Sequence, residues 1–167
     1  MSDPALRVRE ALSRLPVAGE IIPCDPEKAD TAVFCEHYGY APEDSANTIL
    51  VAAKTGEKRI VACVLLADSR LDVNHVVRKR LESRRVSFAS GEQTRALTGM
   101  EIGGVTPFAL PEHISVWVDA RVMTREQIVL GAGTRDAKIV VPPAVFEHLA
   151  NVEVIEGLAN RIEANPA

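Results

Sequence analysis

A stretch rich in glycine and proline, residues 98–111, is the part of the sequence best suited to chemistry on a carbonyl or anionic group. It holds three glycines and two prolines between segments typical of a helix and a strand. Gly103 and Gly104 allow backbone angles closed to other residues and let a ligand approach the main chain. Pro107 fixes its own φ and favours an extended Thr106, whose hydroxyl can orient a water. Such a loop can direct backbone N–H groups at an oxygen that gains negative charge. The alternative is an ordinary tight turn, because glycine and proline commonly only punctuate structure.

A second small-residue loop, residues 131–135, offers a complementary set of groups. Gly131 and Gly133 would let a sugar approach, and Arg135 supplies one guanidinium for a phosphate. The alternative is a plain hairpin turn, since a lone Gly-x-Gly carries little information. The dinucleotide-binding fingerprint is incomplete because Asp136 stands at its third glycine position.

The densest basic run is Arg78, Lys79 and Arg80, followed closely by Arg84 and Arg85. Side chains of this kind bind nucleic-acid phosphates through local positive charge. The alternative is a solvated helix face relieved by the neighbouring Glu82. Both interpretations stay open at this point.

The sequence favours chemistry without a metal or cofactor. Cys24 and the run Cys35-Glu36-His37 match no familiar zinc spacing. No Gly-x-Ser-x-Gly elbow accompanies the histidines, which argues against a serine-hydrolase triad. The three cysteines are odd in number and irregularly spaced, which suits reduced thiols better than disulfides.

Length and composition indicate a single domain spanning residues 1–167, with a hydrophobic content of 47% that is ordinary for a globular protein. A formal net charge of −4 argues against a broad nucleic-acid-binding surface but leaves room for a local basic patch. No apolar run reaches the roughly 18 residues of a membrane span. Arginines interrupt the first apolar segment, so it does not resemble a signal peptide. We therefore expect a cytoplasmic protein that does not contact a membrane.

The hydrophobic pattern predicts a mixed α+β chain. Two apolar, β-branched runs joined by a glycine-containing turn, residues 48–53 and 59–66, predict a central hairpin buried on both faces. Further strands are expected over residues 17–24, 85–89, 114–118, 127–130, 138–141 and 152–154, and helices over residues 4–15, 28–37, 73–83, 90–97 and 142–149. Because strands and helices mix without strict alternation, we expect a curved mixed sheet or barrel flanked by helices, ending in a polar C-terminal tail.

Thr98-Gly99 leading into Gly103-Gly104-Val105-Thr106-Pro107-Phe108, after a basic helix and short strand over residues 73–89, resembles the YbaK family. This family includes the Cys-tRNA(Pro) deacylase and the editing domain inserted in bacterial prolyl-tRNA synthetase. The likeness runs over about residues 21–149, and includes Asp25-Pro26 with Ala29 and Thr31, the strand 48–51 and the segments 129–135 and 139–149. The resemblance implies a mixed α/β, barrel-like fold and hydrolysis of the ester that links a wrong amino acid to the 3′ end of a tRNA.

The chain departs from the resemblance at Asn47, because the family usually has a lysine immediately before the strand that starts at Thr48. In the family that lysine is associated with the active site and the tRNA end. Asparagine can donate a hydrogen bond but supplies no charge. Three readings follow: Asn47 acts as a neutral donor, another cation compensates, or the domain binds without turnover.

Our prediction is a freestanding trans-editing deacylase that acts on misacylated tRNA, tRNA(Pro) being one candidate, with an aminoacyl-tRNA synthetase as a further partner and a monomer or weak homodimer as its state. An aminoacyl ester is labile, so backbone donors and a positioned water or ribose hydroxyl suffice without a side-chain nucleophile. The alternative is a non-catalytic module of the same fold that binds an aminoacyl group, a nucleotide or a protein. The predicted catalytic positions are Asn47, Gly103, Gly104 and Thr106; the substrate-binding positions are Thr31, Thr48, Val105, Pro107, Gly131, Gly133 and Arg135; the tRNA-binding positions are Arg78, Lys79 and Arg80.

Overall fold

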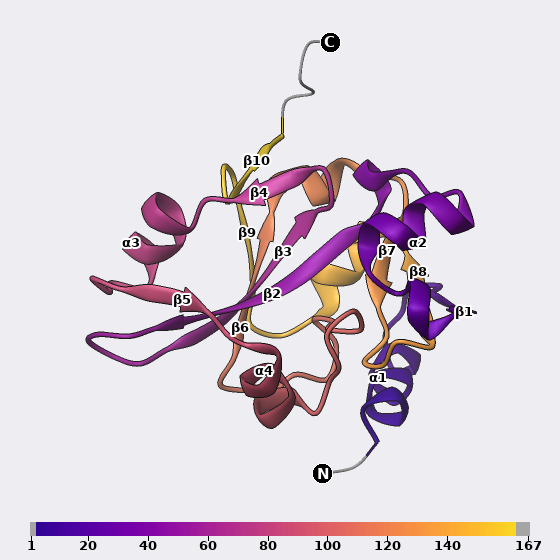
Figure 1. Ribbon diagram of the computed structural model, residues 1–167, viewed down its shortest axis with the longest axis horizontal. Coiled ribbons are helices and arrows are strands. Elements are labelled where there is room, and N and C mark those ends of the chain that lie inside the picture. The colour runs from indigo at the N-terminus through magenta and orange to yellow at the C-terminus, as the bar shows by residue number, and fades with distance from the viewer. Residues whose placement is uncertain (1–2, 163–167) are drawn as a thin grey trace.

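A five-stranded mixed sheet forms the centre of the protein, as seen in a computed structural model that describes residues 3–162 (Figure 1). Its strand order is β5-β2-β3-β6-β9. The pairs β2/β5 and β2/β3 are antiparallel, whereas β3/β6 and β6/β9 are parallel. The strands are β2 (Ala46–Ala53), β3 (Ile60–Leu66), β5 (Val86–Phe88), β6 (Ser115–Asp119) and β9 (Val152–Ile155). The predicted mixed sheet is therefore confirmed.

The central hairpin is also confirmed, and its burial explains its continuous apolar sequence. Side chains alternate across the sheet, so Leu50 and Val64 join one hydrophobic cluster while Val51 and Cys63 join the cluster on the other face. Because both faces are covered along most of the hairpin, its sequence shows no polar alternation, and the polar residues Asn47 and Thr48 stand at the start of β2.

A second sheet of three antiparallel strands, in the order β1-β8-β7, lies beside the first. It consists of β1 (Glu20–Pro23), β7 (Ile128–Gly131) and β8 (Ala137–Val141). An isolated parallel bridge between Ser45 and Val129 joins it to the start of β2. One face of this sheet packs on the larger core cluster, and the other packs on a small cluster around Phe34 of α2 (Thr31–Tyr38).

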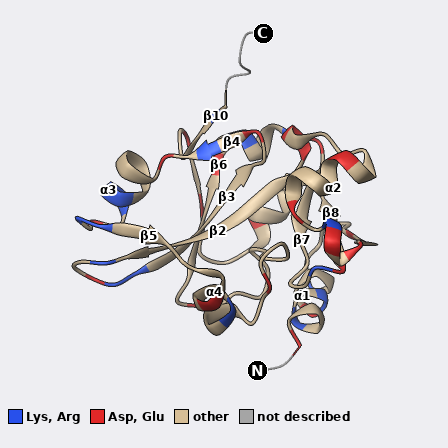
Figure 2. Cartoon of the chain, in the orientation of Figure 1, with Lys and Arg blue, Asp and Glu red and all other residues tan. Residues whose placement is uncertain are grey.

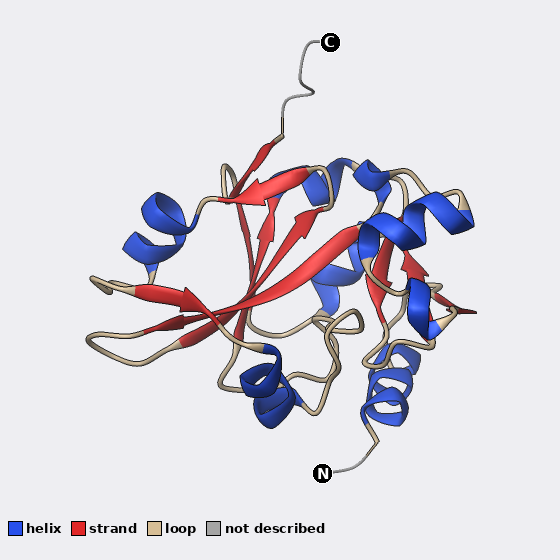
Figure 3. Ribbon diagram, in the orientation of Figure 1, coloured by secondary structure: helices blue, strands red, loops and turns tan. Residues whose placement is uncertain are grey.

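Helices flank the two sheets (Figure 3). Several of them begin and end at capping residues that the sequence indicates. The Asp3 side chain accepts a hydrogen bond from the Ala5 amide at the start of α1 (Pro4–Ser13). A capping box between Ser90 and Gln93 opens α4 (Gly91–Thr98). Glycine in the left-handed conformation ends both α2, at Gly39, and α4, at Gly99. The helices predicted over residues 4–15, 28–37 and 90–97 therefore exist, with ends that differ by a few residues.

Three expectations need correction. The helix expected over residues 73–83 is a π-helical segment, Val73–Val77, followed by the single turn α3 (Arg78–Arg80), and the helix after Pro142 is a 3₁₀ helix, Pro143–His148. The expected polar tail instead contains β10 (Ala159–Arg161), which pairs with β4 (Ser69–Leu71) and follows the fully buried Leu158. Both strands are three residues long and exist through long-range pairing, which no local pattern reveals. None of the helices in residues 3–162 is long and apolar enough to cross a membrane.

Candidate active site

A pocket of about 270 Å³ opens between β2, α2 and the glycine loop that follows α4. Its floor is apolar, with Leu50 and Leu130 among the lining residues, and its polar groups come from four different segments. These polar residues are Asp30, Thr31, Ser45, Asn47, Thr48, Thr94 and Lys138. An apolar pocket with a few convergent polar groups is the usual form of a small-molecule site.

Asn47 and Thr31 meet on one side of this pocket. The Thr31 hydroxyl, at the start of α2, donates a hydrogen bond of 2.5 Å to Oδ1 of Asn47 on β2. This bond orients the amide so that its nitrogen is the free end, and within residues 3–162 that nitrogen makes no hydrogen bond. The pair therefore presents two neutral N–H donors to a ligand.

Thr48 supplies a second unused polar group. Its side chain is only 8% exposed and lines the pocket, yet Oγ1 has no hydrogen-bond partner among the described residues. A buried hydroxyl without a partner costs about 1–3 kcal/mol. Oγ1 is itself enclosed, so a polar atom of a ligand would remove that penalty only after a local rearrangement brings the two into contact.

The two glycine-containing loops pack backbone against backbone and form one wall. The Gly133 amide donates to the Gly104 carbonyl at 2.6 Å, and the Glu101 amide donates to the Gly133 carbonyl at 3.2 Å. A Cβ at Gly104 would lie 2.4 Å from the Thr134 carbonyl oxygen, and one at Gly131 would lie 2.4 Å from the Val105 carbonyl oxygen. These two glycines are thus explained by the close approach of two main chains.

Gly103 differs, since it has a φ of +89° and its backbone lines the pocket. A left-handed φ is open to glycine and disfavoured for other residues. Of the adjacent pair Gly103-Gly104, Gly103 alone lines the cavity. The Gly104 amide already donates to the Glu101 carbonyl at 2.9 Å, so the Gly103 amide is the one of the two left to act as a donor at the pocket edge.

The structure brings six of the predicted site residues together around the pocket: Thr31, Asn47, Thr48, Gly103, Val105 and Gly131. Others lie elsewhere. Gly104 faces the second loop, Gly133 packs against the Pro4 backbone, and Thr106 and Pro107 are buried outside the pocket lining. The Thr106 hydroxyl is 0% exposed with no partner in the described chain, so the expected role of orienting a pocket water lacks geometric support.

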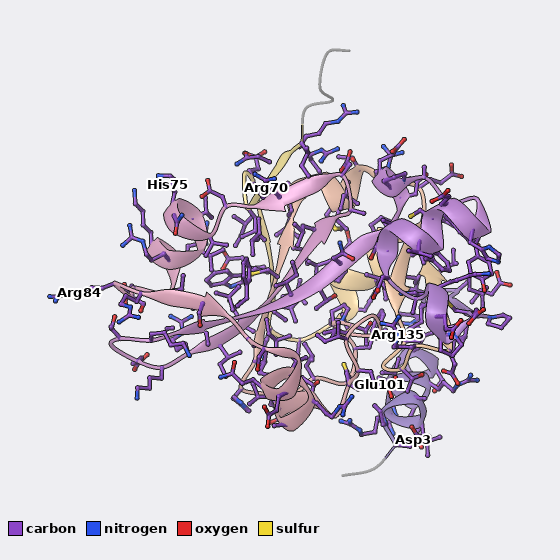
Figure 4. The ribbon with its side chains drawn as sticks, in the orientation of Figure 1. Asp3, Arg70, His75, Arg84, Glu101 and Arg135 are labelled. Atoms are coloured by element: carbon purple, nitrogen blue, oxygen red, sulfur yellow. The ribbon has the colours of Figure 1, made fainter. Side chains whose placement is uncertain are left out.

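Arg135 is occupied by protein groups. Its Nη1 donates to Oδ1 of Asp30 at 3.0 Å and to the Ile102 carbonyl at 2.9 Å, and its Nε donates to the Pro26 carbonyl at 2.9 Å. Its backbone amide donates to the carboxylate of Glu101, which lies near it in Figure 4. The guanidinium therefore ties the glycine loop to the segment before α2, and its predicted phosphate contact would need those bonds to be exchanged.

Sequence reasoning missed Lys138, which the structure places in the pocket wall. The residue is 6% exposed, and its Nζ donates to the carbonyls of Ala29, at 2.7 Å, and Gly103, at 2.8 Å. The ammonium also lies 5.4 Å from the Phe34 ring centroid. Burial lowers the pKa of Lys138 below its ordinary value. The available signal was a single lysine inside the apolar run of β8, because a charge there must find buried partners.

The basic run lies away from the pocket, on α3 and on the neighbouring loop tips (Figure 2). Arg80 forms an ion pair of 2.6 Å with Glu153, and Arg78 donates to the Asn74 carbonyl at 2.9 Å. Lys79 is exposed. The expected role of these residues in tRNA binding stays a prediction.

The described residues contain no group of three or more His, Cys, Asp or Glu side chains placed to hold a metal ion. Cys24, Cys35 and Cys63 are all free and buried. Burial raises the pKa of Cys63 to about 12 and raises that of Cys24, so both are neutral thiols near pH 7. Neither is suited to act as a nucleophile.

Three solved structures share this fold. A hypothetical protein superposes with a TM-score of 0.81 at 22% identity, covering 92% of this chain and 99% of that chain. A candidate trans-editing enzyme for prolyl tRNA synthetase superposes with a TM-score of 0.78 at 18% identity, and the superposition covers 93% of this chain and 97% of that chain. A candidate signal transduction protein from Marinobacter aquaeolei VT8 superposes with a TM-score of 0.63 at 19% identity, and the superposition covers 92% of this chain but 30% of that longer chain.

At these identities the superpositions show the fold alone. The family assignment comes from sequence: the model of the aminoacyl-tRNA editing domain matches residues 25–149, which include Asn47, both glycine loops and the buried Lys138. This match confirms the family inferred from the glycine loop and its neighbours, and the chain belongs to the aminoacyl-tRNA editing domain family.

Proposed function

We propose that this protein is a trans-editing deacylase that hydrolyses the ester of a misacylated tRNA in the pocket between β2 and the glycine loop. The observation that carries the proposal is a family-matched pocket whose donors lack partners: the Asn47 amide nitrogen and the Thr48 hydroxyl, beside the Gly103 backbone. A ligand rich in oxygen, such as an aminoacyl ester on a ribose, would satisfy them.

In the proposed reaction the water oxygen bonds to the ester carbonyl carbon. The C–O bond to the ribose then breaks, and a water proton ends on the ribose oxygen. The backbone N–H of Gly103 would stabilise the negative charge that develops on the carbonyl oxygen. The Asn47 amide would hold the ester or a ribose hydroxyl in place, and the apolar floor would receive the amino-acid side chain.

A non-catalytic binding module is the second candidate. Among residues 3–162, Asp30 is the one carboxylate in the pocket lining, and it is already paired with Arg135. The described part of the chain therefore offers no unpaired carboxylate in the lining to act as a general base. Incubating the purified chain with a panel of mischarged tRNAs separates the two: release of free amino acid above the spontaneous rate supports the deacylase, whereas tight binding without release supports the module.

Thr48→Val is expected to raise stability and impair catalysis. Removing an unpartnered buried hydroxyl should increase the free energy of unfolding by about 1 kcal/mol, while loss of a substrate contact should lower kcat/KM about tenfold. Thermal melts and single-turnover deacylation measure the two effects.

Thr106→Val is the matched control, because Thr106 also has a buried, unpartnered hydroxyl among the described residues but lies outside the pocket lining. It should give a similar gain in stability with unchanged kinetics. Equal kinetic losses in both variants would show that Thr48 does not contact the substrate.

Reversing Arg78 and Arg80 to Glu tests the predicted tRNA contact at α3. Binding of tRNA should weaken, and the slope of log K against log salt should become shallower by roughly 1 to 2, because fewer phosphate counterions are released. Reversing Arg9 and Arg14, on and after α1, makes the same change in net charge away from α3. If both double variants bind tRNA equally well, α3 is an ordinary solvated surface.

A further inference from the structure

Two cations connect the same pair of segments across the pocket entrance. Lys138 Nζ bonds the carbonyls of Ala29 and Gly103, and Arg135 bonds Pro26 and Asp30 on one side and Ile102 on the other. Residues 26–30 lead into α2, while residues 102–103 belong to the glycine loop. The separation of these two pocket walls is therefore set by two side chains that come from the end of one hairpin.

The two cations differ in how their charge is compensated. Arg135 is partly exposed and pairs with the carboxylate of Asp30 at 3.0 Å. Lys138 is buried, and among the residues that the structure describes no carboxylate oxygen lies within 4.0 Å of its ammonium. Its neighbours are two neutral carbonyls and the Phe34 ring. A buried charge is costly unless an opposite charge or several hydrogen bonds offset it.

The register of β8 explains why this lysine is aimed at the pocket. Ala137, Ile139 and Val141 point into the larger core cluster, so the alternating positions face the other side of the sheet. On that side Val140 packs with Phe34. Lys138 lies two residues earlier in β8, nearer the second glycine loop, and lines the pocket. The alternation of side chains along β8 therefore places the charged Lys138 side chain in the pocket wall.

We propose that Lys138 fixes the Gly103 peptide and supplies the positive charge that stabilises the anion formed from the substrate ester. The carbonyl of the Gly103–Gly104 peptide accepts from Lys138 at 2.8 Å, and the N–H of the same peptide, on Gly104, donates to the Glu101 carbonyl at 2.9 Å, so this peptide is held at both ends. The bond to Lys138 fixes the Gly103 backbone where it lines the pocket, and the ammonium brings its positive charge to the same wall. The inference rests on the proposed function and identifies Lys138 as a positioning residue of that site.

Titration offers a readout that a purely structural lysine would lack. The ionisable groups facing Lys138 are Cys24, Cys35, Asp30 and Arg135. Asp30 is bound to Arg135, and the pKa of Cys24 is raised by its own burial. Since burial lowers the pKa of Lys138, its charge is lost at a lower pH than that of an ordinary lysine. Binding of an anion should weaken as the pH rises through that lowered pKa.

The experiment compares two adenosine analogues that differ in charge. One carries an aminoacyl group through a neutral 3′ amide, and the other carries a 3′ phosphonate monoester that mimics the anionic tetrahedral intermediate. For Lys138→Met, phosphonate affinity is expected to fall at least about tenfold while amide affinity changes less than about threefold. Lys138→Arg should recover part of the phosphonate affinity because it restores the charge.

Arg135→Met is the matched control, since it removes the other link between the same two segments while leaving the charge of Lys138. It should weaken both analogues to a similar extent. If Lys138→Met likewise weakens both equally, Lys138 only braces the pocket walls and the inference is overturned.

If Lys138→Met does not fold, the pH dependence of analogue binding by the wild-type protein tests the inference instead. Its phosphonate affinity should decline relative to its amide affinity as the pH rises, and a ratio that is constant with pH overturns the inference. A wild-type protein that hydrolyses mischarged tRNA but shows no such decline disproves this role alone. A protein that neither hydrolyses mischarged tRNA nor binds either analogue disproves the proposed function, and this inference with it.

Discussion

Gly104→Val is expected to lose deacylase activity and a large part of the stability of the fold. The new Cβ would lie 2.4 Å from the Thr134 carbonyl oxygen, 2.6 Å from its carbon and 2.8 Å from its nitrogen. These are backbone atoms, so no side chain can rotate to make room. Overpacking of this kind costs about 1–3 kcal/mol or more. Because the two loops must then separate, the Gly103 backbone leaves its position, and a displacement near 1 Å lowers the rate roughly 100-fold.

Thermal melts and deacylation assays on the same preparation test this result. Gly39→Ala is the control, since Gly39 has a φ of +77° with nothing within 4 Å of its Cβ position. It should show modest backbone strain and normal kinetics. From sequence alone, Gly104→Val would be expected to abolish activity in a folded protein by filling substrate space. A folded but inactive variant would support that interpretation over the packing of the two loops.

Asn47→Ala should slow hydrolysis by roughly 10- to 1000-fold, the range for losing an ordinary to a strong positioned donor. The mutation removes the amide nitrogen that faces the pocket and also the acceptor of the Thr31 hydroxyl. Single-turnover rates on one mischarged tRNA measure the loss. Asn47→Lys should change substrate preference or tighten binding of the tRNA end, because a point charge replaces a neutral donor.

Thr31→Val serves as the control for Asn47→Ala, because it breaks the same hydrogen bond but leaves the amide in place. Its rate should fall less. The simpler view of Asn47, that it ends the turn before β2, predicts altered thermal stability with intact kinetics. That view has little support, since Asn47 lies inside β2 and pairs with Leu65. Normal kinetics in all three variants would exclude Asn47 from the site.

The sequence by itself determined the features that depend on neighbouring residues. Two apolar, β-branched runs and the turn at Gly56 specify the β2/β3 hairpin, and Ser90 with Gln93 specifies the start of α4. The same local order allowed the family to be inferred from the residues around Gly103 and Thr48. These signals are short-range, because caps, turns and strand periodicity act over a few residues.

Only the tertiary structure decided which residues meet. The Lys138 ammonium bonds the Ala29 carbonyl across 109 positions of the chain, and β10 forms only because β4 lies beside it. It also separated the roles of adjacent glycines, since Gly103 faces the pocket while Gly104 packs against Thr134. Thr48 and Thr106 are chemically identical, yet one lines the pocket and the other is enclosed in the core. The physical reason is that burial and hydrogen-bond partners arise from packing between distant segments, and local residue patterns do not encode that packing.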